Sequence, residues 1–297
     1  MIHDNNTSQV TSCHVSIVVL GVSYQSNSEA LCFLRQFAGG KAGQRPFVIL
    51  IDNGDAPDLS SALSDAERTQ RDLMVHIPGS NLGYFGGAAS ALDAFLLTYP
   101  LPDWVIVCNV DLFVQDENFF SRLISYSRSH THSVVAPGVI SGLSGKDQNP
   151  FMRVRPHRLR MKFYKILFQW YPAHLIYSVM YLIKEKLHKL SHGSEVGMPE
   201  PLGTGEPLPI YAGHGAFLAF RKSYFEAGGS LRHGAFLFGE EIFVAETVKR
   251  LGLTIGYDPR LRVFHRGHTT TGYIPSQQIA VHVREAARYC ADTWFSG

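Results

Sequence analysis

Apolar runs alternate with helix-spaced segments along the first 111 residues. Three runs rich in Val and Ile predict buried β-strands, at 14–24, 47–52 and 103–111. Apolar residues recur every three or four positions at 29–37 and 86–99, which predicts helices. Between these two helices, residues 73–80 continue the alternation of apolar runs and helix-spaced segments. Strand, helix and strand in succession predict parallel pairing through right-handed crossovers. We therefore expect an α/β fold.

The alternation of predicted strands and helices stops after residue 143. Residues 144–209 hold loop residues, a basic aromatic segment and the Gly/Pro-rich stretch GMPEPLGTGEPLP, which indicates an insertion. From 210 the pattern resumes with a strand, a short helix, a second helix at about 239–251 and a last strand. With no evident repeat, the simplest organisation is a polar tail at 1–13 and two halves of one mixed α/β domain, at 14–143 and 210–297.

Composition narrows the class of protein. The chain has 297 residues, 45% of them hydrophobic and 18% charged, which excludes a disordered or coiled-coil chain, and its net charge of +2 implies no acidic partner. Its four cysteines lie far apart without a C-x-x-C pair, so neither a zinc ribbon nor a disulfide framework is expected. The polar N-terminus lacks the basic start and apolar run of a secretory signal, so we expect a cytoplasmic protein.

Polar residues follow two of the predicted strands. In open α/β sheets ligands bind beyond the carboxyl ends of the strands, so Asp52, Asn53, Asn109 and Asp111 are expected around one crevice. Strand alternation would point Asn109 and Asp111 to the same side, where a carboxylate can ligate Mg²⁺ or Mn²⁺ on a diphosphate. The alternative is a capped turn, because Asn and Asp are common where strands end.

Asn81 and three glycines, Gly83, Gly86 and Gly87, precede the helix predicted at 86–99. Glycines let a ligand approach the backbone, and a helix start favours an anion. The spacing matches neither G-x-G-x-x-G nor a P-loop, so tight packing of the turn is the alternative.

Six segments occur together in an order that resembles the family 2 glycosyltransferases with the GT-A fold. They are VSIVVLGVSYQS, VILIDNGD, NLGYFGGAA, WVIVCNVD, GHGAFLAFRKSYFEAGG and FLFGEEIFVAETVKRLG. The resemblance covers roughly residues 14–143 and 210–270, and is closest to non-processive, rhamnosyltransferase-like bacterial enzymes of surface polysaccharide synthesis. It implies a Rossmann-like mixed sheet flanked by helices, with nucleotide-sugar binding in 14–143 and acceptor binding in 210–297.

The resemblance also implies roles for single residues. Asp111 would ligate Mg²⁺ or Mn²⁺, helped by a late histidine, with His268 preferred because His265 lies nearer the last strand. Glu241 would be the catalytic base, with Glu240 and His214 near the acceptor. The implied nucleotide-sugar contacts are Tyr24, Asp52, Asn53, Asn81, Gly83, Gly86, Gly87 and Asn109.

Helix physics alone also accounts for the glutamates of LFGEEIFVAE. Glu240 and Glu241 would sit in the first turn of a helix, where carboxylates offset the helix dipole by about 0.3–1 kcal/mol each. Glu246 lies about 140° round from Glu241 at about 100° per residue, so the two face different sides of the helix and cannot share one role. The resemblance singles out Glu241 as the base and leaves Glu246 a structural residue.

The insertion combines cations with aromatic residues. ILFQWYPAHLIYSVMYLI, residues 166–183, contains no Asp, Glu, Lys or Arg, but its Gln, Pro and His argue against a membrane span. Its basic flanks favour a helix pair lying on an anionic membrane surface, the alternative being an apolar hairpin packed on the domain. No motif supports nucleic-acid binding. The basic residues are Arg153, Arg155, Arg158, Arg160, Lys162, Lys165, Lys184, Lys186 and Lys189.

The expected function is metal-dependent, inverting transfer of a sugar from a UDP- or dTDP-sugar to a glycan hydroxyl, with a lipid-linked glycan expected at the inner face of a bacterial cytoplasmic membrane. One alternative is a catalytically inactive family member that acts as a membrane-associated assembly scaffold, because Asn109 and Glu241 depart from the usual acids. Another is a sugar nucleotidyltransferase, but that needs a basic Gly-rich loop after the first strand, which LGVSYQSNSE lacks.

Overall fold

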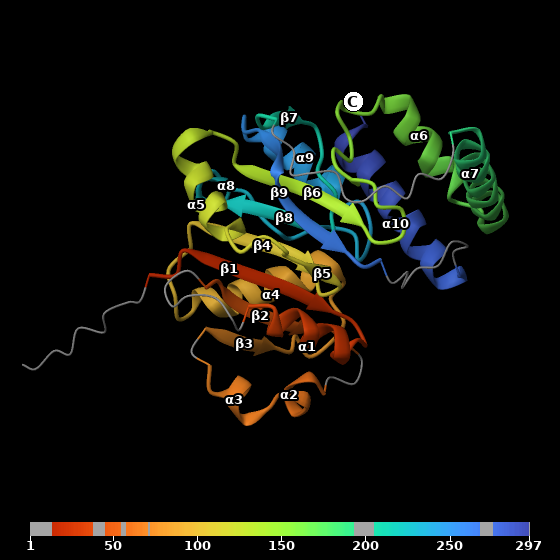
Figure 1. The fold of residues 1–297 in the computed structure, drawn as a ribbon. Helices are drawn as coiled ribbons and strands as arrows, with labels where there is room; N and C mark the ends of the chain where they lie inside the picture. The colour runs from red at the N-terminus through yellow and green to blue at the C-terminus, as the bar shows by residue number, and fades with distance from the viewer. Residues whose placement is uncertain are drawn as a thin grey trace, which may run out of the picture.

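The computed structural model describes residues 14–37, 45–54, 58–70, 72–192, 205–267 and 276–296, which form one mixed sheet with helices around it (Figure 1). The strands are β1 Ile17–Ser23, β2 Phe47–Asp52, β3 Leu73–His76, β4 Trp104–Asn109, β5 Leu112–Phe113, β6 Val134–Ser141, β7 Leu208–Ile210, β8 Phe217–Arg221 and β9 Ile255–His265. The helices are α1 Asn27–Arg35, α2 Leu59–Ala62, α3 Asp65–Arg68, α4 Tyr84–Leu96, α5 Phe119–Ser129, α6 Arg158–Leu167, α7 Tyr171–His192, α8 Lys222–Glu226, α9 Glu240–Arg250 and α10 Gln277–Trp294.

The sheet order is β3-β2-β1-β4-β8-β6-β9-β5, with β7 paired to β9. Strands β1 to β4 are parallel, whereas β8 runs antiparallel to both β4 and β6, and β9 is parallel to β6. Two reversals restore the original direction, so β6 and β9 point the same way as β1, β2 and β4. The carboxyl ends of these strands therefore meet at one edge, together with the beginning of β8.

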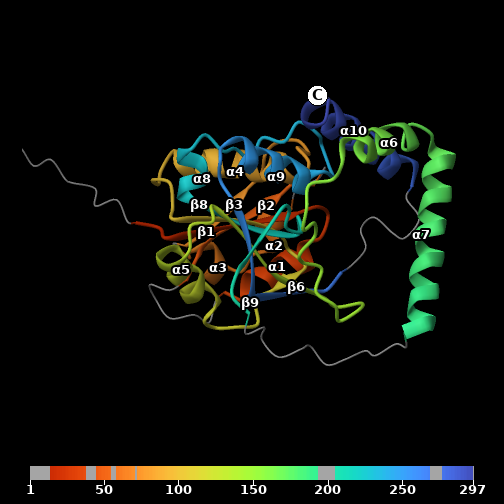
Figure 2. The ribbon, with the colours of Figure 1, turned by 90° about the horizontal axis from the view of Figure 1, so that it is seen from above.

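Side-chain alternation divides the core into two layers. Val18 and Leu20 of β1 pack toward α4 and α9, whereas Ile17 and Val19 pack toward α1 and α5. Figure 2 shows α4, α8 and α9 on one side of the sheet and α1, α3 and α5 on the other. Strands buried on both faces explain the near-continuous Val/Ile runs of the sequence.

The prediction of a mixed α/β fold is confirmed, but the sequence pattern missed several elements. Strand β6 carries Pro137 and Gly138 in its middle, where its register with β9 shifts, and these residues hid the strand signal. Helices α5 and α10 were also missed, although the Ser276 side chain caps α10 as a sequence signal would require. Strand β4 ends at Asn109, so Asp111 lies in the following turn and strand alternation does not extend to it.

The segment from 144 to 209 contains the two helices α6 and α7. Helix α6 packs along α10, and Figures 1 and 2 show α7 standing out from the body of the molecule. Among the described residues, no helix is both long and apolar enough to cross a bilayer.

A buried carboxylate joins this segment to the domain. Glu246 of α9 accepts two hydrogen bonds from Arg155, at 2.6 and 3.1 Å, and one from the Tyr211 hydroxyl at 2.6 Å. The same guanidinium donates to the carbonyl of Trp294 at the end of α10 and lies 4.1 Å from the Phe295 ring centroid. Arg155 thus ties α9 to the end of α10, where a helix favours a cation.

Substituting Arg155→Leu should lower the free energy of unfolding by about 3 kcal/mol, near the lower end for a broken buried ion pair because Arg155 is partly exposed. The double variant Arg155→Leu/Glu246→Gln should recover part of this loss, because the buried charge is then gone. Denaturant unfolding of the four proteins measures the coupling. Strictly additive losses would show that the pair does not act as a unit.

Candidate active site

Asp111 and His265 meet at the edge where the strands end. The pairing of β5 with β9 sets Leu112 opposite His265, and the backbone N–H of Arg266 donates to the carbonyl of Asp111. This register brings His265 Nε2 to 3.2 Å from Asp111 Oδ2. Both side chains are largely buried, at 14% and 10% exposure.

The arrangement leaves acceptor atoms facing each other. His265 Nδ1 lies 2.9 Å from Gln148 Oε1, and an amide oxygen only accepts, so Nδ1 carries the proton. In the neutral ring Nε2 then directs a lone pair at the Asp111 carboxylate, whose Oδ1 is buried and has no hydrogen-bond partner among the described residues. A second proton on the ring or a bound cation would relieve this contact.

These donors fit a divalent metal ion. A carboxylate and an imidazole suit Mn²⁺, and Mg²⁺ or Mn²⁺ keeps several positions for water and phosphate oxygens. Within the described part of the chain no cluster of three or more His, Cys, Asp or Glu residues could hold a metal, and this pair supplies two donors. Asp111 and His265 could thus hold a metal that a ligand's oxygens complete.

Glu241 reaches the same region through the loop before β8. Its Oε1 accepts the backbone N–H of Gly215 at 3.2 Å, and a Cβ at Gly215 would lie 2.8 Å from that oxygen. The Tyr84 hydroxyl donates to the Gly215 carbonyl at 2.9 Å, and the carbonyl of Ala216 accepts from the N–H of Asn109 at 3.0 Å. The loop is thereby fixed between α4, β4 and the glutamate.

Both glutamates at the start of α9 have raised pKa values. Burial, followed by the charge of Glu241, raises the pKa of Glu240 to about 8, and burial raises that of Glu241. Glu240 is 5% exposed and accepts from the N–H of Phe238 at 3.0 Å, whereas Glu241 is partly exposed. Counted over the whole residue, Glu241 is the more exposed of the two. Glu246 faces Arg155 and Tyr211, as its structural role requires.

His214 sits between these groups as a neutral ring. Burial and the neighbouring His265 lower the pKa of His214 to about 4. Its Nδ1 accepts the N–H of Ala216 at 3.1 Å, so Nε2 carries the proton, and the His214 and His265 ring centroids are 6.1 Å apart. Asn149 Oδ1 accepts the backbone N–H of His214 at 2.8 Å. The ring is therefore an oriented hydrogen-bond donor.

The residues predicted to contact the nucleotide sugar differ in their exposure and hydrogen bonding. Asn53 is 3% exposed and donates to Asn81 Oδ1 at 3.0 Å and to the Gly83 carbonyl at 2.9 Å, so its amide fixes a turn. Asp52 is 4% exposed and accepts the N–H of Leu59 at 2.9 Å. Tyr24, just beyond β1, is 40% exposed. Tyr24 is thus open to solvent. The side chains of Asp52, Asn53 and Asn81 instead form hydrogen bonds with backbone groups.

The glycines serve packing. Gly83 has φ +73°, and a Cβ there would lie 1.8 Å from the carbonyl oxygen of Phe236, so only glycine fits. At Gly87 a Cβ would lie 3.3–3.4 Å from Ile51 and Asn53, and at Gly86 3.1 Å from the Leu82 Cβ. These contacts favour the packing alternative for the glycine segment.

The structure also brings in residues that the sequence did not single out. Gln148 orients His265, and Tyr84 links α4 to the loop before β8. Tyr84 lies inside the NLGYFGGAA segment, but no local signal marks Gln148, because its partner is 117 positions away. His268, the preferred metal ligand, lies outside the described residues.

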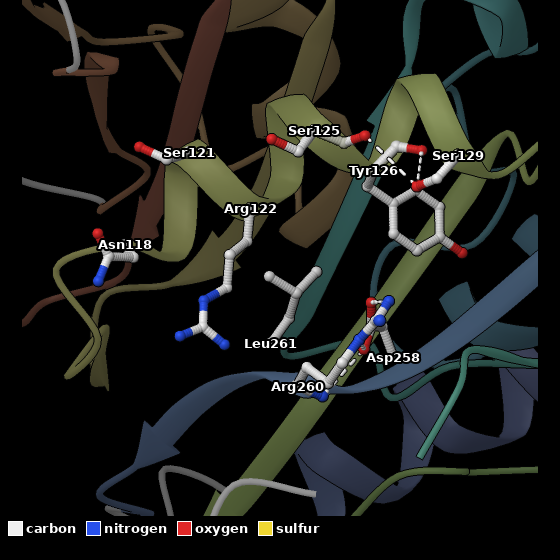
Figure 3. A pocket seen from close by; sticks show the side chains of 9 residues that line it. All are labelled: Asn118, Ser121, Arg122, Ser125, Tyr126, Ser129, Asp258, Arg260 and Leu261. Carbon is white, nitrogen blue, oxygen red and sulfur yellow. Dashed lines mark hydrogen bonds and ion pairs between the residues drawn. The ribbon is translucent and has the colours of Figure 1, made fainter. Parts of the chain in front are cut away.

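A separate hollow of about 470 Å³ lies between α5 and β9. Figure 3 shows Arg122 and Arg260 directed into it, and each guanidinium already pairs with a carboxylate, that of Asp116 or Asp258. None of the candidate site residues lines this hollow. It is distinct from the strand-end edge.

Comparison with known proteins identifies the fold. Neither a protein-family model nor a curated protein sequence matches the chain. The structure is similar to that of GalNAc-T7 with UDP, GalNAc and Mn²⁺, with a TM-score of 0.53 and 14% identity over 86% of this chain. It also matches the mannosyltransferase PcManGT from Pyrobaculum calidifontis in complex with GDP-Man and Mn²⁺, with a TM-score of 0.49 and 13% identity over 88% of this chain.

The chain spans 44% of the GalNAc-T7 chain and 59% of the PcManGT chain. At these identities the likeness shows the fold alone. The mixed sheet with its flanking helices is the GT-A fold of glycosyltransferases, which confirms the expected fold class. Membership of family 2 stays a prediction.

Substituting Gln148→Met should weaken Mn²⁺ binding about 10- to 100-fold, because His265 loses the acceptor that fixes its tautomer. Gln148→Glu keeps an acceptor and should bind within a few-fold of the original protein. Mn²⁺ titration followed by electron paramagnetic resonance measures both, and unfolding midpoints control for damage to the fold. Equal affinities of the Met and Glu variants would refute the orienting role.

The contribution of Glu240 to stability should fall as pH rises from about 5 to 8, because its carboxyl group must ionise in a buried site although its unfolded pKa is near the ordinary value. Glu240→Gln should reduce this slope, with the remainder due to the raised pKa of Glu241, and should stabilise the protein at pH 9 on the order of 3–5 kcal/mol. Calorimetry at pH 5, 7 and 9 tests it, with the exposed Glu117→Gln as control. Parallel profiles for the two variants would contradict the assignment.

Proposed function

We propose that this protein transfers a sugar from a nucleoside diphosphate sugar to a glycan hydroxyl. The observation that carries the proposal is the convergence of Glu241 and of the Asp111–His265 pair on the loop His214–Ala216, at the strand-end edge of a GT-A sheet. Ligands of open α/β sheets bind at such an edge. A carboxylate with a raised pKa beside a metal-competent pair suits proton removal close to a leaving diphosphate.

On the donor side, Tyr24, Asp52 and Asn81 border the nucleotide and Asn109 contacts its ribose or sugar. A UDP- or dTDP-sugar suits Asp52, because the carboxylate has lone pairs left to accept the N–H of a pyrimidine base. The GalNAc-T7 structure holds UDP and Mn²⁺, which supports the choice of ligands. Asp111 and His265 would hold Mg²⁺ or Mn²⁺, which would supply positive charge against the diphosphate. His268 lies three positions beyond His265 and stays a candidate ligand.

On the acceptor side, Glu241 takes the proton of the acceptor hydroxyl. The hydroxyl oxygen forms a bond to the anomeric carbon of the donor sugar, and the bond from that carbon to the diphosphate breaks. The nucleoside diphosphate leaves with the electron pair. One displacement inverts the anomeric configuration and needs no covalent enzyme intermediate. His214 and Glu240 support the acceptor pocket from its buried side.

We place the protein among family 2 glycosyltransferases of the non-processive, rhamnosyltransferase-like type. The acceptor that we propose is a lipid-linked intermediate of a bacterial surface polysaccharide such as O-antigen or capsule. Access to it would come at the inner face of the cytoplasmic membrane, with the protein bound peripherally. The motif order across 14–143 and 210–270 supports this finer assignment.

Glu241→Gln should keep donor binding and lower the transfer rate about 10²- to 10⁴-fold, because the general base is lost. Asp111→Asn should instead weaken Mn²⁺-dependent donor binding. A screen of nucleotide sugars with Mn²⁺, followed by thermal shift and by product release, measures both effects. Glu246→Gln is the matched control on the same helix, and it should lower the melting temperature but retain transfer.

Unimpaired transfer by Glu241→Gln would remove the base from the mechanism. If no nucleotide sugar raised the melting temperature in the presence of metal, the inactive scaffold would become the better description.

A further inference from the structure

Helix α6 presents apolar side chains to water. Leu159, Phe163 and Ile166 are 64%, 55% and 70% exposed, and at about 100° per residue they fall within about 60° of one another. Met161, the buried residue of the helix, lies on the opposite side. Trp170 follows in the turn to α7 and is 73% exposed.

Helix α7 repeats the pattern. Ile176, Val179, Met180 and Ile183 are 62%, 42%, 64% and 53% exposed, and their spacing of three and four residues places them on one face. His174 is buried on the opposite side, where its ring lies 4.7 Å from that of Phe168. Both helices therefore turn an apolar face outward, the reverse of a helix adapted to water. Large exposed apolar patches mark sites of contact.

The charge around the α6 face identifies the partner. Lys162 and Arg158 lie on one flank of the apolar face and Arg160 on the other, at about 100° per residue. No Asp or Glu occurs between residues 148 and 184. An apolar face bordered by cations suits a bilayer interface with anionic headgroups.

Other partners fit less well. In a symmetric dimer built on this face, each basic flank would meet the basic residues of the second copy, which opposes pairing. Nucleic acid would pair with the cations but leave the apolar stripes in water.

The face is tied closely to the proposed catalytic base. Met161 packs with Ile242 and Cys290 in one cluster, and Ile242 directly follows Glu241. Met161, on the buried side of α6, therefore connects the exposed apolar face of this helix to the start of α9. Figure 1 shows α6 beside α10 at the same end of the molecule.

We propose that the apolar faces of α6 and α7, with Trp170 between them, dock the protein onto an anionic lipid bilayer. The stripes enter the headgroup region, and the cations contact lipid phosphates. Docking itself does not depend on catalysis, whereas delivery of a lipid-linked acceptor to Glu241 rests on the proposed function.

The test is co-sedimentation of the full chain with vesicles of 70% phosphatidylcholine and 30% phosphatidylglycerol, at low and high salt. Ile166→Ser/Trp170→Ser should abolish binding, and Arg158→Gln/Lys162→Gln should weaken partitioning about 30-fold at low salt. Leu97→Ser, which changes an 88% exposed leucine on the distant α4 end, is the matched control and should bind normally. Equal binding by all variants, or equal binding to pure phosphatidylcholine, would overturn the proposal.

Two further measurements separate the alternatives. Size-exclusion chromatography with light scattering detects self-association, and a dimer that the Ile166→Ser/Trp170→Ser variant dissociates would replace the bilayer with a second copy. Donor turnover on a soluble acceptor separates docking from catalysis. If the protein retained turnover but did not bind vesicles, docking would be rejected and the proposed function would stand. The Glu241→Gln variant should lose turnover while keeping vesicle binding.

Discussion

The antiparallel strand β8 between β4 and β6 is the constraint on which the site depends. Its ladder joins β4, the end of the first parallel strands, to the β6–β9 pair, and it aligns all of their carboxyl ends. The same pairing makes the carbonyl of Ala216 accept from Asn109, which places the loop before β8 against the end of β4. The register of β5 with β9 brings Asp111 to His265, and Glu241 of α9 joins them through its hydrogen bond from the N–H of Gly215.

Electrostatic interactions at that edge of the sheet are unfavourable for the ionised side chains. Two adjacent carboxylates lie at the start of α9, and burial opposes their ionisation, while Asp111 Oδ2 and His265 Nε2 lie 3.2 Å apart and face each other as two acceptors when the ring is neutral. By contrast, Glu246, five positions beyond Glu241, is matched by Arg155 and Tyr211. Buried carboxylates with raised pKa values beside a close Asp–His contact are typical of a functional site.

Local patterns predicted much of this molecule, and their failures have physical reasons. The Val/Ile runs gave β1, β2 and β4 because strands buried on both faces need apolar residues throughout. Pro137 and Gly138 concealed β6, since propensity cannot anticipate a strand that its neighbours hold in place. Gln148 had no local signal, because its role arises from a contact with His265 formed only on folding.

By itself the sequence determined the α/β class, the presence of polar residues after the strands and the segment rich in cations and aromatics between residues 144 and 209. Periodicity and residue type act locally, so they can be seen without a structure. Only the tertiary structure decided that His265 faces Asp111, that Asn53 fixes a turn, and that α6 and α7 turn their apolar faces to solvent. These outcomes depend on strand order and on packing between distant segments, which no local pattern encodes.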